Sequence, residues 1–228
     1  MKPVISAIVM AYNEAASIDD TCREIHAELS RIGDPFELII IDDGSTDGTS
    51  AKADAIAVSL PYSKVVHHAV NSGLGGVYRT GFSAAAGSYV TFFPADGQFP
   101  ADIIRKFRPM MSEYDMVLGF LPERKGQAFA KFLSKAERCL YTALFGRLPA
   151  FQGIMMFRRE LPGMFRLKSS GRGWAVVMEL IIRVSRAGFR ITSVPTGYRP
   201  RRSGSSKVNN LRNIIANLLQ VIVLRFNI

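Results

Sequence analysis

Two apolar, β-branched runs separated by a helical pattern place the strongest constraint on the fold. Residues 4–10 and 36–42 both have the composition of buried strands. Between them, apolar side chains recur at helical spacing, at Ile18, Cys22, Ile25, Leu29 and Ile32. A strand, a helix and a second buried strand in this order predict two parallel strands joined by a crossover helix.

The same alternation continues along the chain. An Ala-rich helix of about ten residues follows residue 49, and the pattern then predicts a strand at 64–68, a helix at 77–86 and a strand at 89–93. Further strands are expected at 115–118, 154–157 and 190–194, with helices at 128–145 and 175–187. The sequence therefore predicts an α/β fold whose mostly parallel sheet has helices on both faces. In such sheets ligands bind beyond the carboxyl ends of the strands.

Charge is distributed unevenly along the 228 residues. Residues 1–115 hold 9 basic and 15 acidic side chains, residues 116–179 hold 11 and 4, and residues 180–228 hold 9 and none. An acidic first half, with no recognisable nucleic-acid module, argues against a nucleic-acid binder. The pattern favours one region that handles a cation and another that meets an anion, such as a phosphate or an anionic membrane surface.

The cysteines and the apolar segments show which further kinds of site and segment the sequence does not favour. Cys22 and Cys139 have no CxxC neighbour, which argues against a zinc site. No segment reaches the roughly 20 apolar residues of a membrane span. Residues 4–11 could imitate a signal sequence, but no small-residue cleavage site follows, so a buried strand is the better interpretation. Residues 208–228 predict an amphipathic helix that lies on a membrane or packs against the domain.

Carboxylates gather directly after the second predicted strand. The segment IDDGSTDGT, residues 41–49, holds Asp42, Asp43 and Asp47 in a short turn. Asp favours turns for structural reasons alone. Carboxylates at a strand end can also accept hydrogen bonds from a nucleotide base or a ribose hydroxyl, and for the cluster we favour ligand binding.

A second candidate site follows the strand at 89–93. Asp96 and Gln98 flank Gly97 in the segment PADGQ, and oxygen ligands so spaced suit Mg²⁺ or Mn²⁺, which take the rest of their shell from water and a substrate diphosphate. A surface turn between two prolines is the alternative. NSGLGG, residues 71–76, is either the wall of a binding loop or a plain turn. His67 and His68 are adjacent on a strand and face opposite ways, so they do not predict a shared metal site.

Basic loops are the last candidates, and together they predict an anion site. They contain Arg124, Lys125, Lys131, Ser134, Arg199, Arg201, Arg202, Ser206 and Lys207.

Taken in order, these motifs resemble one family. MAYNE, IDDGSTDGT, NSGLGG, PADGQ, FQGIMMFRRE, the helix with Glu179 and VPTGYRPRRSGSSK are similar to inverting family 2 glycosyltransferases with a Rossmann-like GT-A-type fold, and most of all to dolichol- or polyprenyl-phosphate sugar transferases. The resemblance runs from about residue 4 to 207. It implies a glycosyltransferase domain at 1–207, with a nucleotide and metal half at 1–115 and an acceptor half at 116–207, followed by the helix at 208–228.

The resemblance also implies roles for single residues. The donor nucleotide would meet Ala11, Tyr12, Glu14, Asp42, Asp43 and Asp96, and a Mg²⁺ or Mn²⁺ ion would bind Asp96 and Gln98. The phosphate of the acceptor, or the diphosphate of the donor, would meet Arg124, Lys131, Ser134, Arg201, Ser206 and Lys207. The catalytic set implied is Asp96, Arg201 and Glu179.

Two positions depart from the family pattern. The family usually has Asp-x-Asp where this chain has Pro94, Ala95 and Asp96, and usually an Asp at the position of Ala150. The loss of one carboxylate weakens the metal site or moves its second contact elsewhere.

The expected reaction is transfer of a sugar from a nucleoside-diphosphate sugar to a polyprenyl phosphate. This acceptor is already anionic and needs cations rather than a base, and the second half of the chain is rich in cations. A saccharide acceptor would need a general base, for which Glu179 is the candidate. A nucleotide-sugar-binding homologue with impaired catalysis is the other alternative. We expect a cytoplasmic protein at a membrane surface, or a partner of a membrane-embedded subunit.

Overall fold

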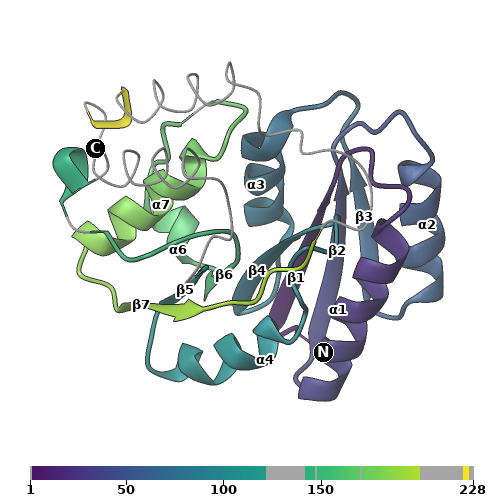
Figure 1. Cartoon of the computed structure of the whole chain (residues 1–228), viewed down its shortest axis with the longest axis horizontal. Coiled ribbons are helices and arrows are strands. Elements are labelled where there is room, and N and C mark those ends of the chain that lie inside the picture. The colour runs from purple at the N-terminus through teal and green to yellow at the C-terminus, as the bar shows by residue number, and fades with distance from the viewer. Residues whose placement is uncertain (1, 122–141, 147, 170, 201–222, 226–228) are drawn as a thin grey trace.

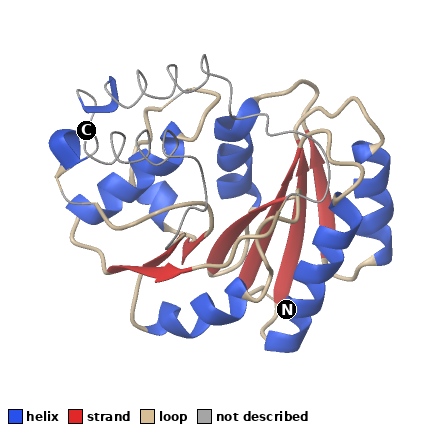
Figure 2. Cartoon of the chain, viewed as in Figure 1, coloured by secondary structure: helices blue, strands red, loops and turns tan. Residues whose placement is uncertain are grey.

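The computed structural model describes residues 2–121, 142–146, 148–169, 171–200 and 223–225. Within these residues a seven-stranded sheet has the order β3-β2-β1-β4-β6-β5-β7 and helices on both sides (Figures 1 and 2). The strands are β1 (Ile5–Ala11), β2 (Phe36–Asp42), β3 (Ser63–His67), β4 (Tyr89–Pro94), β5 (Met116–Phe120), β6 (Met155–Arg158) and β7 (Ile191–Pro195).

The sheet is mostly parallel, as predicted. β1 pairs in parallel with both β2 and β4, and β2 pairs in parallel with β3. β6 is the exception, because it runs antiparallel to its neighbours β4 and β5. The carboxyl ends of β1, β2, β3 and β4 therefore meet at one edge, while the carboxyl end of β6 lies at the opposite edge.

Two hydrophobic cores lie on the two faces of the sheet. Ile5 and Val9 of β1 face the core formed with α1 (Ile18–Ile32), α2 (Thr49–Ser59) and α4 (Ile103–Phe107), whereas Ile8 faces the core formed with α3 (Gly73–Ala84) and α7 (Ala175–Arg186). Successive strand residues point to opposite faces, so a strand covered on both sides is apolar throughout. This explains the unbroken apolar runs of β1 and β2.

Several element boundaries differ from the sequence expectation. The helix expected at 77–86 begins at Gly73, so its first turn lies inside the NSGLGG segment. Three short helices were not expected: α4, the 3₁₀ helix η1 (Arg108–Ser112) and α6 (Leu161–Met164). Each has five residues or fewer, too short for a helical period to show in the sequence. The helix expected at 128–145 and the C-terminal helix lie mostly outside the described residues.

In the described part of the chain, no helix combines the length and the apolarity needed to cross a membrane.

The packing of α3 against the sheet gives a first prediction. A Cβ on Gly81 would lie 2.4 Å from Cε1 of Phe92 and 2.9 Å from Cδ1 of Ile8, both fully buried. G81A should therefore lower the free energy of unfolding by about 1–3 kcal/mol through overpacking. Urea denaturation measures it, with G163A as the matched control, because a Cβ on Gly163 meets nothing within 4 Å. Equal stability of the two variants would contradict this account of the packing.

Candidate functional site

The predicted nucleotide residues lie at one edge of the sheet. Ala11, the last residue of β1, pairs with Asp42 of β2, and its carbonyl accepts a hydrogen bond from the amide of Asp43 at 2.9 Å. On the other side of β1, the amide of Ala95 donates to Met10 at 2.9 Å, which places Asp96 beside the same strand end. The parallel register thus brings together side chains that are more than 80 residues apart in the sequence.

The loops after β1 and β2 are joined by hydrogen bonds. The amide of Asn13 donates to Oγ of Ser45 at 2.9 Å, and the amide of Thr46 donates to Oδ1 of Asn13 at 2.8 Å. The amide of Glu14 donates to Oγ1 of Thr49 at 2.8 Å. The MAYNE and IDDGSTDGT motifs therefore form one connected surface, which carries Tyr12 and Glu14 next to Asp42 and Asp43.

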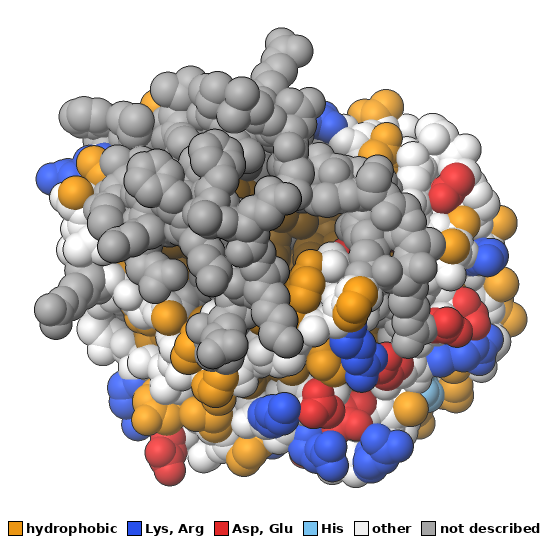
Figure 3. All heavy atoms as spheres, in the orientation of Figure 1, with side chains coloured by type: hydrophobic (Ala, Val, Ile, Leu, Met, Phe, Trp, Pro, Cys, Tyr) orange, Lys and Arg blue, Asp and Glu red, His pale blue; other side chains and the backbone are white. Residues whose placement is uncertain are grey.

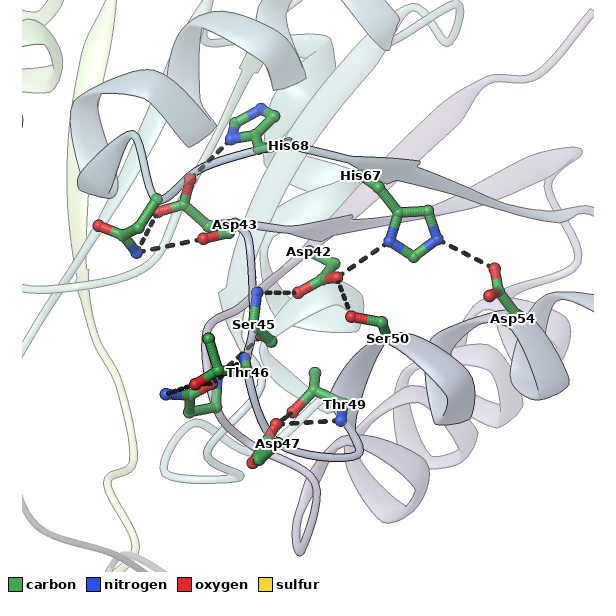
Figure 4. A network of polar contacts seen from close by, with 12 residues as sticks. Asp42, Asp43, Ser45, Thr46, Asp47, Thr49, Ser50, Asp54, His67 and His68 are labelled. Carbon is green, nitrogen blue, oxygen red and sulfur yellow. Dashed lines mark hydrogen bonds and ion pairs between the residues drawn. The ribbon is translucent and has the colours of Figure 1, made fainter.

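Asp42 is buried and holds three neighbouring segments (Figure 4). Its Oδ1 accepts the amide of Ser45, and its Oδ2 accepts Oγ–H of Ser50 at 2.6 Å and contacts Nδ1 of His67 at 2.9 Å. Burial opposes ionisation, but the hydrogen bonds from Ser45, Ser50 and His67 outweigh it, and the pKa of Asp42 is lowered. The carboxylate is therefore charged at neutral pH.

Asp43 is also buried, and the hydrogen bonds that it accepts come from the segment before α3 and from α3 itself. Its Oδ1 contacts Nδ1 of His68 at 2.6 Å and accepts the amide of Ser72 at 2.8 Å. Its Oδ2 accepts the side-chain amide of Asn71 at 2.9 Å and the backbone amide of Gly73 at 2.8 Å. A carboxylate has about four positions at which it can accept a hydrogen bond, so these contacts fill the acceptor positions of Asp43.

The two histidines are a feature that the sequence analysis did not assign. His67 pairs with Asp42 in the β2–β3 register, and His68 follows beside Asp43. Each of these two neighbouring aspartates therefore contacts one histidine (Figure 4). His67 also bridges to Asp54 at 3.0 Å. The signal was present as DD after one strand and HH at the end of the next. It becomes informative only once the two strands are known to pair in parallel and in this register.

The glycines of NSGLGG allow a close approach of the loop before α7. The amide of Gly75 donates to the carbonyl of Arg172 at 2.9 Å, and a Cβ on Gly75 would lie 2.2 Å from the carbonyl oxygen of Gly171. Because Asp43 already accepts the first amides of α3, this helix start is occupied by a carboxylate of the chain itself. The segment is thus a helix start and a packing surface rather than a plain turn, and its part in a binding site stays a prediction.

Glu179 lies in the middle of α7 and is fully buried. Its two oxygens accept the backbone amides of Lys168 and Ser169 at 2.7–2.9 Å, and Nε of Arg183 donates to Oε1 at 2.8 Å. Burial raises the pKa of Glu179, but these hydrogen bonds outweigh it, and the pKa is lowered. Glu179 therefore holds the loop before α7 in its fold.

Asp96 and Gln98 lie on either side of a sharp turn at Gly97. Gly97 has φ +70°, a left-handed conformation that reverses the backbone, and the amide of Gln98 donates to Oδ1 of Asp96 at 3.1 Å. Asp96 is 5% exposed. The side-chain amide of Gln98 donates to the hydroxyl of Tyr198.

The donor set of this turn is compatible with a divalent cation. It offers one carboxylate and one amide oxygen, the hard ligands that Mg²⁺ and Mn²⁺ prefer. The described residues contain no group of three or more His, Cys, Asp or Glu side chains that could hold a metal ion. A cation here would take most of its ligands from a substrate diphosphate and water, as Mg²⁺ commonly does in enzymes that act on phosphates.

Other predicted site residues lie outside the described part of the chain. They are Arg124, Lys131, Ser134, Arg201, Ser206 and Lys207. In Figure 3 most of the Asp and Glu side chains visible on this face lie over the half with α1 and α2, where Lys and Arg side chains are mixed among them.

The chain is therefore an α/β protein with helices on both faces of its sheet. Carboxylates at the ends of β2 and β4 and a turn suited to a cation lie at the carboxyl edge, where ligands bind in folds of this class. The sequence profile of Glycosyl transferase family 2 matches residues 6–167. The chain belongs to this family.

Two curated relatives match almost the whole chain. Glycosyltransferase AglD of Haloferax volcanii is 29% identical over 231 residues, which cover 96% of this chain and 36% of AglD. The undecaprenyl-phosphate 4-deoxy-4-formamido-L-arabinose transferase of Salmonella paratyphi A is 26% identical over 221 residues, 92% of this chain and 64% of the transferase. The chain thus spans about a third of the one relative and under two thirds of the other.

Solved structures share the fold. Glucosyl-3-phosphoglycerate synthase from Mycobacterium tuberculosis, in complex with phosphoglyceric acid, superposes with a TM-score of 0.72 at 24% identity, covering 99% of this chain and 79% of the synthase. Its complex with Mn²⁺, UDP-glucose and phosphoglyceric acid gives a TM-score of 0.72 at 25% identity, with 97% and 78% covered. The predicted GT-A-type fold is confirmed.

The bridge between His67 and two aspartates predicts a pH-dependent contribution to stability. Hydrogen bonds to Asp54 and Asp42 raise the pKa of His67 above its ordinary value of 6.5. The stabilisation is therefore fully present below pH 6.5 and is lost as the pH rises through the raised pKa. The difference in free energy of unfolding between wild type and H67Q should be largest in acid and shrink toward alkaline pH.

Denaturation at a series of pH values measures this difference. H26Q is the matched control, because among the described residues the hydrogen-bond partner of the His26 ring is the carbonyl of Pro61 and not a carboxylate. Identical pH profiles for H67Q and H26Q would contradict the bridge.

Proposed function

We propose that the protein transfers a sugar from a nucleoside-diphosphate sugar to the phosphate of a polyprenyl phosphate. Family membership supports sugar transfer, and one relative is named as an undecaprenyl-phosphate transferase. The carboxyl edge supports binding of a nucleotide and a divalent ion through Asp42 and Asp96.

One observation carries the choice of acceptor. A hydroxyl acceptor needs a base, and the acids described in the acceptor half are Glu160 and Glu179. Glu179 is fully buried, accepts hydrogen bonds at both oxygens and has a lowered pKa, which makes it a weak base. Glu160 follows β6, whose carboxyl end lies at the edge opposite Asp96, since β6 runs antiparallel to β4. An acceptor that is already anionic fits this arrangement, because it needs no base.

The donor would lie across the ends of β1, β2 and β4. Asp42 accepts three hydrogen bonds from the chain, so it retains acceptor capacity for a base N–H or a ribose hydroxyl. Asp43 has its capacity filled and would act by keeping Asn71 and α3 in place. Tyr12 and Glu14, on the adjoining loop, would complete the nucleotide site.

Asp96 and Gln98 would hold the divalent ion. Solved structures of the same fold contain Mn²⁺ or Mg²⁺ with UDP, and such an ion neutralises the charge that develops on a departing diphosphate. With Pro94 at the end of β4, this chain supplies one carboxylate in the turn, so the diphosphate would provide more of the ion's ligands.

The acceptor phosphate is proposed to meet the basic loops, with Arg124, Lys131 and Ser134 on one and Arg201, Ser206 and Lys207 on the other. These cations and hydroxyls would orient the phosphate for in-line attack, in which a phosphate oxygen bonds to the anomeric carbon while the bond from that carbon to the diphosphate breaks. The configuration at that carbon inverts. Residues 1–115 would form the donor half and 116–207 the acceptor half. A lipid acceptor would place the protein peripherally at the cytoplasmic face of a membrane.

Calorimetry with GDP-mannose, UDP-glucose and UDP-N-acetylglucosamine, with and without Mn²⁺, identifies the donor. A short-chain polyprenyl phosphate, 3-phosphoglycerate or a free saccharide is then added, and release of the nucleoside diphosphate is measured. Release that depends on the polyprenyl phosphate supports the proposal. Release with a saccharide alone, or binding of a donor without release on any acceptor, overturns it.

D96A tests the role of the turn in this assay. Turnover should fall by about 10²-fold or more, because the departing diphosphate loses its cation, while the unfolding midpoint changes little. D102A is the matched control, since Asp102 lies six residues further on and pairs at the surface with Lys106 at 3.2 Å. Unchanged turnover in D96A would contradict the assignment of Asp96 as a ligand of the divalent ion.

E179Q separates the two kinds of acceptor. If Glu179 only holds the loop before α7, E179Q should lower the free energy of unfolding by about 1–3 kcal/mol, because an amide NH₂ would face buried N–H donors. The pH profile of kcat for the remaining activity should keep its acidic limb. A loss of turnover of about 10²-fold or more with unchanged stability, together with loss of that limb, is the result expected of a general base.

A further inference from the structure

The turn that carries Asp96 and Gln98, residues 95–101, is held by a segment about 100 residues later in the chain. We name residues 95–101 the cation turn. After β7, the amide of Arg199 donates to the carbonyl of Gln98 at 2.7 Å, and the hydroxyl of Tyr198 accepts a hydrogen bond from Nε2 of Gln98. The ring of Tyr198 packs edge-on against Phe99, with centroids 5.5 Å apart. Backbone and side chain of Gln98 are thus both fixed from this segment.

Helix α1 also contacts both the cation turn and the segment after β7. Glu24 accepts two hydrogen bonds from the guanidinium of Arg199, at 3.0 and 2.9 Å, and its Oε1 also accepts the amide of Ala101 at 3.1 Å. One turn earlier on α1, the hydroxyl of Thr21 is shared between the carbonyls of Ser17, at 2.9 Å, and Ala95, at 3.1 Å. Both ends of the cation turn are therefore fastened to α1, and Glu24 joins the turn to the segment with Tyr198.

The orientation of the Gln98 amide matters for a cation. An amide side chain presents either its oxygen or its NH₂ group in a given direction, and only the oxygen binds a metal ion. When Nε2 of Gln98 donates to Tyr198, the oxygen is directed away from the phenol. The other protein ligand of the turn is the carboxylate of Asp96. A fixed amide oxygen therefore contributes more to the affinity for the cation than it would in a site with several carboxylates.

We propose that Tyr198 and Glu24 are positioning residues for the cation turn: Tyr198 holds the side chain of Gln98 by accepting the hydrogen bond from Nε2, which leaves the amide oxygen to the cation, and Glu24 holds Tyr198 in place through Arg199. This inference rests on the proposed metal-dependent function and adds two residues to it. Neither residue contacts the cation. Their effect is to pre-organise the ligand, which strengthens binding without adding a contact.

The test measures Mn²⁺ binding rather than turnover. The full-length protein is titrated with Mn²⁺, followed by the paramagnetic resonance signal of the free ion, in the presence of whichever of GDP or UDP the wild type binds. Y198F keeps the ring packing on Phe99 and loses only the hydroxyl. Its dissociation constant for Mn²⁺ should rise about 3- to 10-fold, the effect of one neutral hydrogen bond, while nucleotide affinity without metal and the unfolding midpoint stay at wild-type values.

Matched variants isolate the effect. Tyr62 is 74% exposed, and its ring packs beside Phe36; Y62F removes its hydroxyl. It should leave Mn²⁺ binding unchanged. E24Q should weaken Mn²⁺ binding in the same direction as Y198F, whereas D19N, which breaks the surface pair of Asp19 with Arg23 on the same helix, should not.

The outcomes separate this inference from the function on which it rests. If the wild type binds Mn²⁺ and Y198F binds it as tightly as Y62F does, the positioning role is overturned and the metal assignment stands. A wild type that binds nucleotide but no Mn²⁺ overturns both. If E24Q weakens nucleotide and Mn²⁺ binding equally and lowers the unfolding midpoint, Glu24 is structural only and its part of the inference is overturned.

Discussion

Two neighbouring carboxylates buried at the end of β2 govern how the carboxyl edge of the sheet is built. Asp42 and Asp43 are 2% and 3% exposed. A buried carboxylate without hydrogen-bond partners is strongly unfavourable, so the surrounding segments have to supply donors. They come from the loop after β2, the end of β3, helix α2 and the start of α3. The loops at the edge are ordered because they satisfy these two charges.

A third buried carboxylate organises a loop in the second half of the chain in the same way. Glu179 is a buried carboxylate that gathers the amides of the loop before α7, and this loop lies on the glycines at the start of α3. Arg79 of α3 strengthens the junction by donating to the carbonyls of Ser169 and Gly171 at 2.8 and 3.3 Å. The first half of the chain, which contains α3, therefore meets the second half, which contains α7, at the start of α3. Both sides of that contact depend on a carboxylate that serves the fold.

The cation turn is built differently, which suits a different task. Asp96 accepts a local hydrogen bond from the amide of Gln98, and backbone groups and the side chain of Gln98 connect the turn to the rest of the chain. Such an arrangement fixes the backbone of the turn. Geometry at a site of this kind depends on the residues behind the ligands as much as on the ligands themselves.

Much of the fold could be predicted from the sequence, because its signals are local. The buried runs of β1 and β2 and the helical period of α1 need only neighbouring residues to be recognised, and the carboxyl-edge position of Asp42 and Asp96 follows from the parallel topology. The start of α3 at Gly73 could not be predicted, because glycines favour turns unless a partner such as Asp43 accepts the first amides of the helix. Glu179 could be singled out from its motif, but not its partners.

By itself, the sequence determined the fold class, the family, and the edge of the sheet where polar side chains gather. Only the tertiary structure decided what each of those side chains does. The physical reason is distance along the chain: Asp43 meets His68 across 25 residues, Glu24 meets Arg199 across 175, and Gln98 meets Tyr198 across 100. A hydrogen bond needs its two atoms about 3 Å apart, and no local pattern of residues encodes which distant atoms the packing of the sheet and helices will bring that close.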